Sequence, residues 1–165
     1  MVCSGVAGGG VTDWKQDRIG SALRGENPTV LRRLPSGFAV VGDTQFLPGY
    51  CVLLAEPEVG HLSDLSLPAR SRFLTDMSLL GEAVERVCRP EGLVRINYEI
   101  LGNGLPCLHA HVYPRYAWES DERRRGPVRL YPPDELYGPA YALSDAHDEL
   151  RRSIGDALDE LADVE

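Results

Sequence analysis

The run from Cys107 to Tyr113 constrains the fold most, because it alternates strictly between two kinds of side chain. Side chains of a β-strand point alternately to opposite faces, so the three apolar members, Leu108, Ala110 and Val112, share one face. The cysteine, the two histidines and the tyrosine share the other. The run therefore predicts a half-buried strand whose apolar side packs on a helix and whose opposite side presents two imidazoles next to each other.

Other periodic segments indicate what surrounds this strand. Apolar residues recur at helical spacing from residue 68 to about 89 and from about 144 to 162. Strand-like runs separated by turn residues cover 29–34, 38–41, 50–55, 93–98 and 107–113. A short helix capped by Asp13 is expected to end at Leu23, and 119–127 is expected to be irregular. This order predicts an α+β fold with a mainly antiparallel sheet, a long helix and an additional C-terminal helix.

Length and composition indicate one globular domain. The chain has 165 residues, of which 43% are hydrophobic and 25% charged. We expect residues 1–12 to form a flexible N-terminal tail and 13–165 a single domain. The net charge of −8 argues against duplex nucleic acid as a partner. The four cysteines include no CxxC pair, which favours reduced thiols. The sequence starts without a secretory signal and has no long apolar run, which favours a cytoplasmic protein with no membrane partner.

Two neighbouring histidines on one strand face suit phosphoryl chemistry. Imidazole is neutral and nucleophilic near pH 7, and a second imidazole can stay protonated beside phosphate oxygens. Two alternatives remain open: strand histidines with no chemical role, and a zinc site made by Cys107, His109 and His111. Alternate strand residues lie about 6–7 Å apart, which strains a three-ligand set. A cupin-type metal site is disfavoured because the next carboxylate is Glu119. No metal or cofactor is expected.

The residues around the histidines extend the pattern. His109-x-His111-Val112-x-Pro114-Arg115 resembles the signature of the histidine-triad (HIT) family, and Pro-Arg is typical of its fragile-histidine-triad, diadenosine polyphosphate hydrolase-like branch. The resemblance continues upstream through 38–41, Pro48-Gly49-Tyr50, His61 with Asp64-Leu65, 94–97 and Gly102-Asn103. It covers residues 29–115 as a core, with 119–165 as a C-terminal extension.

The resemblance implies roles for particular residues. His109 falls on the histidine that attacks an α-phosphate to give a nucleotidyl-histidine intermediate, and His111 on the one that contacts phosphate oxygens. Asp43 falls near a ribose-binding position, and Asn97 and Asn103 near positions that bind phosphate or the leaving group. The implied activity is hydrolysis of dinucleoside polyphosphates or related nucleoside phosphate esters and phosphoramidates, by a homodimer. A nucleotidyl transferase or phosphorylase, or a non-catalytic nucleotide-binding protein, are the alternatives.

Three departures from the family pattern stand close to the nucleophile. Cys107 replaces the first histidine, Tyr50 replaces the histidine of the Pro-Gly-His turn, and Asn103 replaces a glutamine. Cys107 is kept as a candidate substrate-binding residue.

Other side chains have competing interpretations. The arginines at 123–125 suit a polyphosphate tail but are expected to lie in a solvated loop. Tyr116 and Trp118 could stack on a base but are expected to pack in the core. His61 and His147 are expected to be structural.

Overall fold

The computed structural model describes residues 13–162. The five strands are β1 (Val30–Leu34), β2 (Gly37–Val41), β3 (Cys51–Ala55), β4 (Leu93–Glu99) and β5 (His109–Tyr116). The α-helices are α1 (Arg18–Leu23), α2 (Leu67–Cys88), α3 (Asp121–Arg125), α4 (Pro133–Leu136) and α5 (Asp148–Ala162). Short 3₁₀ turns are η1 (Leu62–Asp64), η2 (Arg89–Glu91), η3 (Val128–Leu130), η4 (Pro139–Tyr141) and η5 (Asp145–His147). This is the α+β fold that the sequence predicts.

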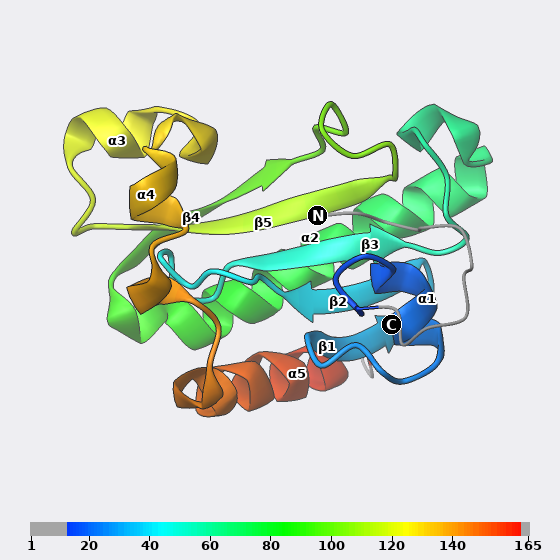
Figure 1. Ribbon diagram of the computed structural model, residues 1–165, viewed down its shortest axis with the longest axis horizontal. Coiled ribbons are helices and arrows are strands. Elements are labelled where there is room, and N and C mark those ends of the chain that lie inside the picture. The colour runs from blue at the N-terminus through cyan, green and yellow to red at the C-terminus, as the bar shows by residue number, and fades with distance from the viewer. Residues whose placement is uncertain (1–12, 163–165) are drawn as a thin grey trace.

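The strands form one antiparallel sheet in the order β1-β2-β3-β5-β4. Helix α2 crosses one face of this sheet, and α5 packs beside α2 and against β1 (Figure 1). The main apolar core lies between the sheet and these helices, and it contains Leu108, Ala110 and Val112 from β5. The prediction that the apolar side of this strand packs on a helix is therefore confirmed.

The long helix α2 has clear sequence causes. The Ser66 hydroxyl accepts a hydrogen bond from the Ala69 backbone N–H at the start of the helix, and Pro68 occupies its first turn. Phe73, Leu80 and Val84 are fully buried against the sheet, so the helical spacing read from the sequence identifies the packed face. The predicted bounds of 68 and 89 differ by one residue from those observed.

The opposite face of the sheet carries a second, smaller core. Residues of α1, β2 and β3 pack there, namely Ile19, Ala22, Phe38, Val40, Val52 and Leu54. Val52 lies opposite His111 in the register of β3 with β5, and Leu54 lies opposite His109. Directly opposed residues share a face, so the histidines lie on this side of the sheet, at the border of the smaller core.

Four local expectations differ from the structure. Helix α1 begins at Arg18 rather than after Asp13, because Asp17 caps it by accepting from the Gly20 backbone N–H at 3.0 Å. Strand β5 begins at His109, and α5 begins at Asp148 after the turn η5. The segment expected to be irregular contains α3, which Ser120 caps by accepting a hydrogen bond from the backbone N–H of Arg123.

A buried ion pair fastens the start of the C-terminal extension. The guanidinium of Arg115 donates two hydrogen bonds to Glu119 from Nε and one from Nη2, and both side chains are fully buried. Arg115 also donates to the carbonyl oxygens of Arg123 and Gly126 at 2.7 and 2.9 Å. The Tyr131 hydroxyl donates to Glu119 at 2.8 Å. These bonds fix residues 119–131 against the end of β5.

A second attachment joins the extension to the loop after β2. The backbone N–H of Gln45 donates to the carbonyl oxygen of Tyr141 at 2.7 Å, and that of Leu143 donates to the backbone carbonyl oxygen of Asp43 at 2.9 Å. The Thr44 hydroxyl donates to the carbonyl oxygen of Leu136. The loop that carries Asp43 is therefore held by the C-terminal extension.

Some expectations concern the chain as a whole. No helix within residues 13–162 is long and apolar enough to cross a bilayer. Cys51 and Cys88 are buried free thiols, as expected for these two residues, whereas Cys107 is disulfide-bonded and departs from the expectation of reduced thiols. The predicted tail at 1–12 lies outside the described residues.

Candidate active site

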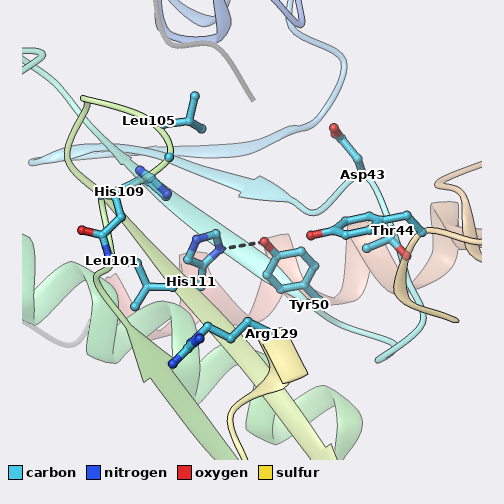
Figure 2. A pocket seen from close by; sticks show the side chains of 12 residues that line it. Asp43, Thr44, Tyr50, Leu101, Leu105, His109, His111 and Arg129 are labelled. Carbon is cyan, nitrogen blue, oxygen red and sulfur yellow. Dashed lines mark hydrogen bonds between the residues drawn. The ribbon is translucent and has the colours of Figure 1, made fainter. Parts of the chain in front are cut away.

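A cleft of about 690 Å³ opens on the histidine side of the sheet (Figure 2). Its walls come from the loop after β2, the loop between β4 and β5, strand β5 itself and the C-terminal extension. The lining residues are Asp43, Thr44, Tyr50, Leu101, Gly102, Asn103, Gly104, Leu105, His109, His111, Arg129 and Tyr137. Four predicted site residues, Asp43, Asn103, His109 and His111, thus meet in one cavity.

His109 has one ring nitrogen tied to the backbone. Its Nδ1 atom lies 2.8 Å from the carbonyl oxygen of Cys107. A carbonyl oxygen can only accept a hydrogen bond, so Nδ1 carries the proton in the neutral ring and Nε2 keeps its lone pair. The side chain is 4% exposed and contributes to the cleft wall. This arrangement presents Nε2 as a nucleophile.

His111 stands beside it in a different state. Its Nδ1 atom lies 2.7 Å from the hydroxyl of Tyr50 (Figure 2). Burial, and then the electrostatic interaction with His109, lower the pKa of His111 to about 4. Burial likewise raises the pKa of Tyr50 well above its ordinary value, so the phenol stays protonated. Tyr50 therefore donates to Nδ1, and the Nε2–H of His111 is a neutral hydrogen-bond donor rather than the protonated imidazole expected from the sequence.

Aromatic packing holds both rings in place. The His109 and His111 rings meet edge to face with centroids 4.8 Å apart. Tyr50 stacks on Tyr113 with centroids 4.5 Å apart, and Tyr113 stacks on His111 at 5.4 Å. Tyr50, which the sequence marks only as a departure from the family pattern, thus supports His111 both through its hydroxyl and through its ring.

Asp43 enters the cleft from the loop after β2. Both of its carboxylate oxygens accept hydrogen bonds from Arg18 of α1, one of them at 3.1 Å. The Arg18 side chain is almost completely buried, whereas the Asp43 side chain is 40% exposed. A buried cation thus orients a carboxylate that still faces the solvent. The sequence gives no signal for Arg18, because its position follows from the packing of α1.

The remaining predicted residues are placed differently. Asn97 lies on β4 opposite Tyr113 and does not line the cleft. Cys107 precedes β5, with its sulfur 3.9 Å from Nδ1 of His109, so its closest support to the nucleophile is its carbonyl oxygen. Glu99, which the sequence analysis does not single out, lies opposite His111 in the β4 and β5 register.

Two lining residues belong to the C-terminal extension and were missed from the sequence. Arg129 comes from the turn η3, and Tyr137 follows α4. Neither belongs to a periodic segment or a motif. The aromatic and basic residues considered from the sequence lie elsewhere: Trp118 stacks on the buried Tyr116, and the arginines at 123–125 do not line the cleft.

The zinc alternative finds no support over residues 13–162, which bring together no group of three histidine, cysteine or acidic side chains able to hold a metal ion. Both Nδ1 atoms of the histidine pair already have partners. His61 is an exposed residue that directly precedes the turn η1, and His147 is a partly buried residue at the end of the turn η5. This placement fits the structural role expected for them.

The fold resembles solved structures of known proteins. No protein-family model matches the sequence, and no curated protein matches it. A histidine triad (HIT) protein from Sinorhizobium meliloti has a TM-score of 0.61 at 17% identity, over 79% of this chain and 87% of that one. A histidine triad protein from Marinobacter aquaeolei has a TM-score of 0.62 at 21% identity, over 80% and 89%.

A third solved structure covers more of the chain. A hypothetical histidine triad nucleotide-binding protein from Sulfolobus tokodaii has a TM-score of 0.64 at 10% identity, over 87% of this chain and 93% of that one. Similarity at such low identity concerns the fold rather than the residues of the site. This chain therefore has the α+β fold of the histidine-triad proteins.

Proposed function

We propose that this protein is a nucleotide hydrolase that acts through a nucleotidyl-His109 intermediate. The observation that carries the proposal is the hydrogen bond between His109 Nδ1 and the Cys107 carbonyl oxygen, which leaves the Nε2 lone pair available in a nucleotide-sized cleft. The proposed substrates are dinucleoside polyphosphates or related nucleoside phosphate esters and phosphoramidates. The resemblance of the sequence around His109 to the histidine-triad signature supports the same choice.

The chemistry follows from the two ring states. Nε2 of His109 attacks the α-phosphorus, a P–N bond forms, and the bond from phosphorus to the leaving group breaks with its electron pair on the leaving atom. The neutral Nε2–H of His111 donates a hydrogen bond to a phosphoryl oxygen as charge builds there. Water then attacks the same phosphorus and gives up a proton to the solvent. The P–N bond breaks with its electron pair on Nε2 of His109, and a nucleoside monophosphate is released.

Asp43 and Asn103 have supporting roles in this proposal. A carboxylate suits the paired hydroxyls of ribose, and the Arg18 contact fixes the orientation of Asp43. Asn103 lies in the loop between β4 and β5 and can donate an amide N–H to a phosphate. Transfer of the nucleotidyl group to phosphate or another acceptor uses the same intermediate and is the second candidate.

Trapping of the intermediate tests the catalytic proposal. Purified protein is mixed with labelled dinucleoside polyphosphates and nucleoside phosphoramidates, quenched within milliseconds to seconds, and analysed by mass spectrometry for nucleotide on His109. We expect an adduct in the wild type and in His147→Ala, whose histidine lies outside the cleft, and none in His109→Ala. If the wild type matched His109→Ala in both adduct and turnover across the panel, the non-catalytic alternative would replace this proposal. Repeating the reaction with added inorganic phosphate distinguishes the two reactions, because hydrolysis releases a nucleoside monophosphate and phosphorolysis releases a nucleoside diphosphate.

We also propose that the protein forms a homodimer through α2 and the edge of the sheet. Strand β4 is an edge strand, and its side chains Val94 and Tyr98 are 52% and 43% exposed. A dimer would cover them. Sedimentation velocity measures the oligomeric state directly, and we expect a dimer for the wild type and a weakened dimer for Val94→Glu. A wild-type monomer at micromolar concentration would contradict the proposal.

A further inference from the structure

The cleft wall contains one cationic side chain, Arg129, and neither the sequence motif nor the histidine pair accounts for it. Among the described lining residues it is the single arginine or lysine. Its guanidinium makes no hydrogen bond or ion pair with any other residue in the 13–162 region. Most arginines of this acidic chain pair with carboxylates or carbonyl oxygens, so a free one in a cavity is available for a ligand.

The backbone that carries Arg129 is firmly held. Val128, its neighbour in η3, is 1% exposed. The carbonyl oxygen of Gly126 accepts a hydrogen bond from the buried Arg115, and Tyr131 donates to Glu119 on the other side. The turn itself is closed by bonds from the backbone N–H groups of Leu130 and Tyr131, each at 3.0 Å. A free guanidinium on a fixed backbone loses less entropy when it binds an anion than one on a mobile loop would.

The position of Arg129 suits a group next to the reacting phosphate. Figure 2 shows Arg129 and Asp43 on opposite sides of the pair formed by His111 and Tyr50. If Asp43 takes the ribose and the histidines take the α-phosphate, an extended substrate continues toward Arg129. Guanidinium binds phosphate well through paired N–H donors, whereas an amine leaving group offers it no negative charge.

We propose that Arg129 forms a subsite for the phosphate bonded to the one that His109 attacks, so that the preferred substrates have a polyphosphate leaving group. This inference rests on the proposed function, and it selects one of the substrate classes considered there. When the α-phosphorus bond breaks, the leaving phosphate gains a negative charge, which Arg129 neutralises. Phosphoramidate substrates, which release an amine, gain nothing from this side chain.

Equilibrium binding tests the subsite without turnover. The probes are adenosine monophosphate and α,β-methylene adenosine diphosphate, whose bridging carbon cannot be cleaved, measured by calorimetry on the wild type, Arg129→Ala and Arg125→Ala. Arg125 is an exposed arginine of the same extension that does not line the cleft, so it controls for general loss of positive charge. Substitution of the exposed Arg129 removes no hydrogen bond or ion pair among the described residues, so we expect folding to be unchanged.

We expect the wild type and Arg125→Ala to bind the diphosphate analogue about fivefold more tightly than the monophosphate, as for a partly exposed ion pair. Arg129→Ala should bind both equally, and Arg129→Lys should retain part of the preference. The preference should shrink as salt rises from about 0.05 to 0.5 M, because screening weakens an exposed pair. An undiminished preference in Arg129→Ala, or no preference or no binding in the wild type, would overturn the subsite.

Kinetics provide the second readout. Arg129→Ala should lower kcat/KM about fivefold or more for diadenosine tetraphosphate and leave it unchanged for an adenosine phosphoramidate. An equal loss on both substrates would assign Arg129 to the attacked phosphate instead and refute the proposal. The two hypotheses fail separately: a binding preference without any His109 adduct would retain the subsite and remove the covalent mechanism, and an adduct without the preference would do the reverse.

Discussion

Removal of the Glu119 carboxylate should strongly destabilise the protein. Glu119 accepts hydrogen bonds from the Arg115 guanidinium, the Tyr116 backbone N–H and the Tyr131 hydroxyl. The Arg115 and Glu119 side chains are both fully buried. Glu119→Ala leaves the Arg115 charge buried without its partner, and loss of one member of a buried pair costs about 3–5 kcal/mol. Since domains of this kind are stable by about 5–15 kcal/mol, the loss is a large fraction of the total.

Urea denaturation followed by tryptophan fluorescence measures this cost. Trp118 stacks on Tyr116 next to the ion pair, so its emission reports on the same region. Glu122→Ala, in the exposed first turn of α3, is the matched control and should change the free energy of unfolding by less than about 0.5 kcal/mol. A loss below about 1 kcal/mol for Glu119→Ala would refute the reasoning, because it would mean that Arg115 finds water or another partner at little cost.

The pH dependence offers an independent check. Burial raises the pKa of the Glu119 carboxyl, but the hydrogen bonds from Arg115, Tyr116 and Tyr131 outweigh it and hold the pKa below its ordinary value of 4.5. A carboxyl with a depressed pKa in the folded state stabilises fully above its unfolded pKa and loses this contribution as pH falls through its folded pKa. The stability difference between wild type and Glu119→Gln should therefore be constant from pH 8 to about 5 and decrease below 4.5. A difference that stayed constant down to pH 2 would contradict the assignment.

Three further outcomes are expected at the cleft. Tyr50→Phe should lower kcat about tenfold, because it leaves Nδ1 of His111 without its hydrogen-bond donor at a cost of about 1–3 kcal/mol. Tyr141→Phe, which lies outside the cleft, should leave kcat unchanged, and equal kcat values for the two variants would contradict this role of Tyr50. The pKa of His111 is lowered to about 4, so as pH falls this imidazole takes up a proton in the unfolded chain before it does so in the folded protein. A fall from pH 7 to 5 should therefore lower the free energy of unfolding of the wild type by about 2 kcal/mol more than that of His111→Asn, as measured by urea titration. The same pH dependence of stability in both proteins would count against a neutral His111. If the exposed ring of Tyr137 stacks on a base, Tyr137→Ala should weaken nucleotide binding about tenfold in calorimetry and Tyr137→Phe should leave it unchanged. The same loss of affinity in both variants would assign the contact to the hydroxyl instead.

The parts of the fold that the sequence predicts are those with local causes. Alternation along 107–113 depends only on neighbouring residues, and it identifies the buried and the reactive face of β5. The helical spacing of Phe73, Leu80 and Val84 places α2 within one residue at each end. The predicted N-cap of α1, Asp13, is wrong because Asp13 and Asp17 are both acceptable N-cap residues. Only the packing of Ile19 and Ala22 into the smaller core shows which of the two begins the helix.

The site is predictable only in part for a related reason. His109 and His111 share one strand, so the sequence alone places them together. Arg18 reaches Asp43 from 25 positions away, and Arg129 enters the cleft from an irregular segment after the last strand. No periodicity or spacing connects these residues, since their positions depend on how the elements pack.

The attachment between the C-terminal extension and the loop after β2 has a kinetic consequence. Thr44 and Leu136 are bonded across 92 residues, a separation that makes such contacts slow to form. The sheet can pair before this closure, but Asp43 and Tyr137 line the same cleft only after it. In a refolding experiment, the recovery of nucleotide binding should therefore lag behind the recovery of secondary structure.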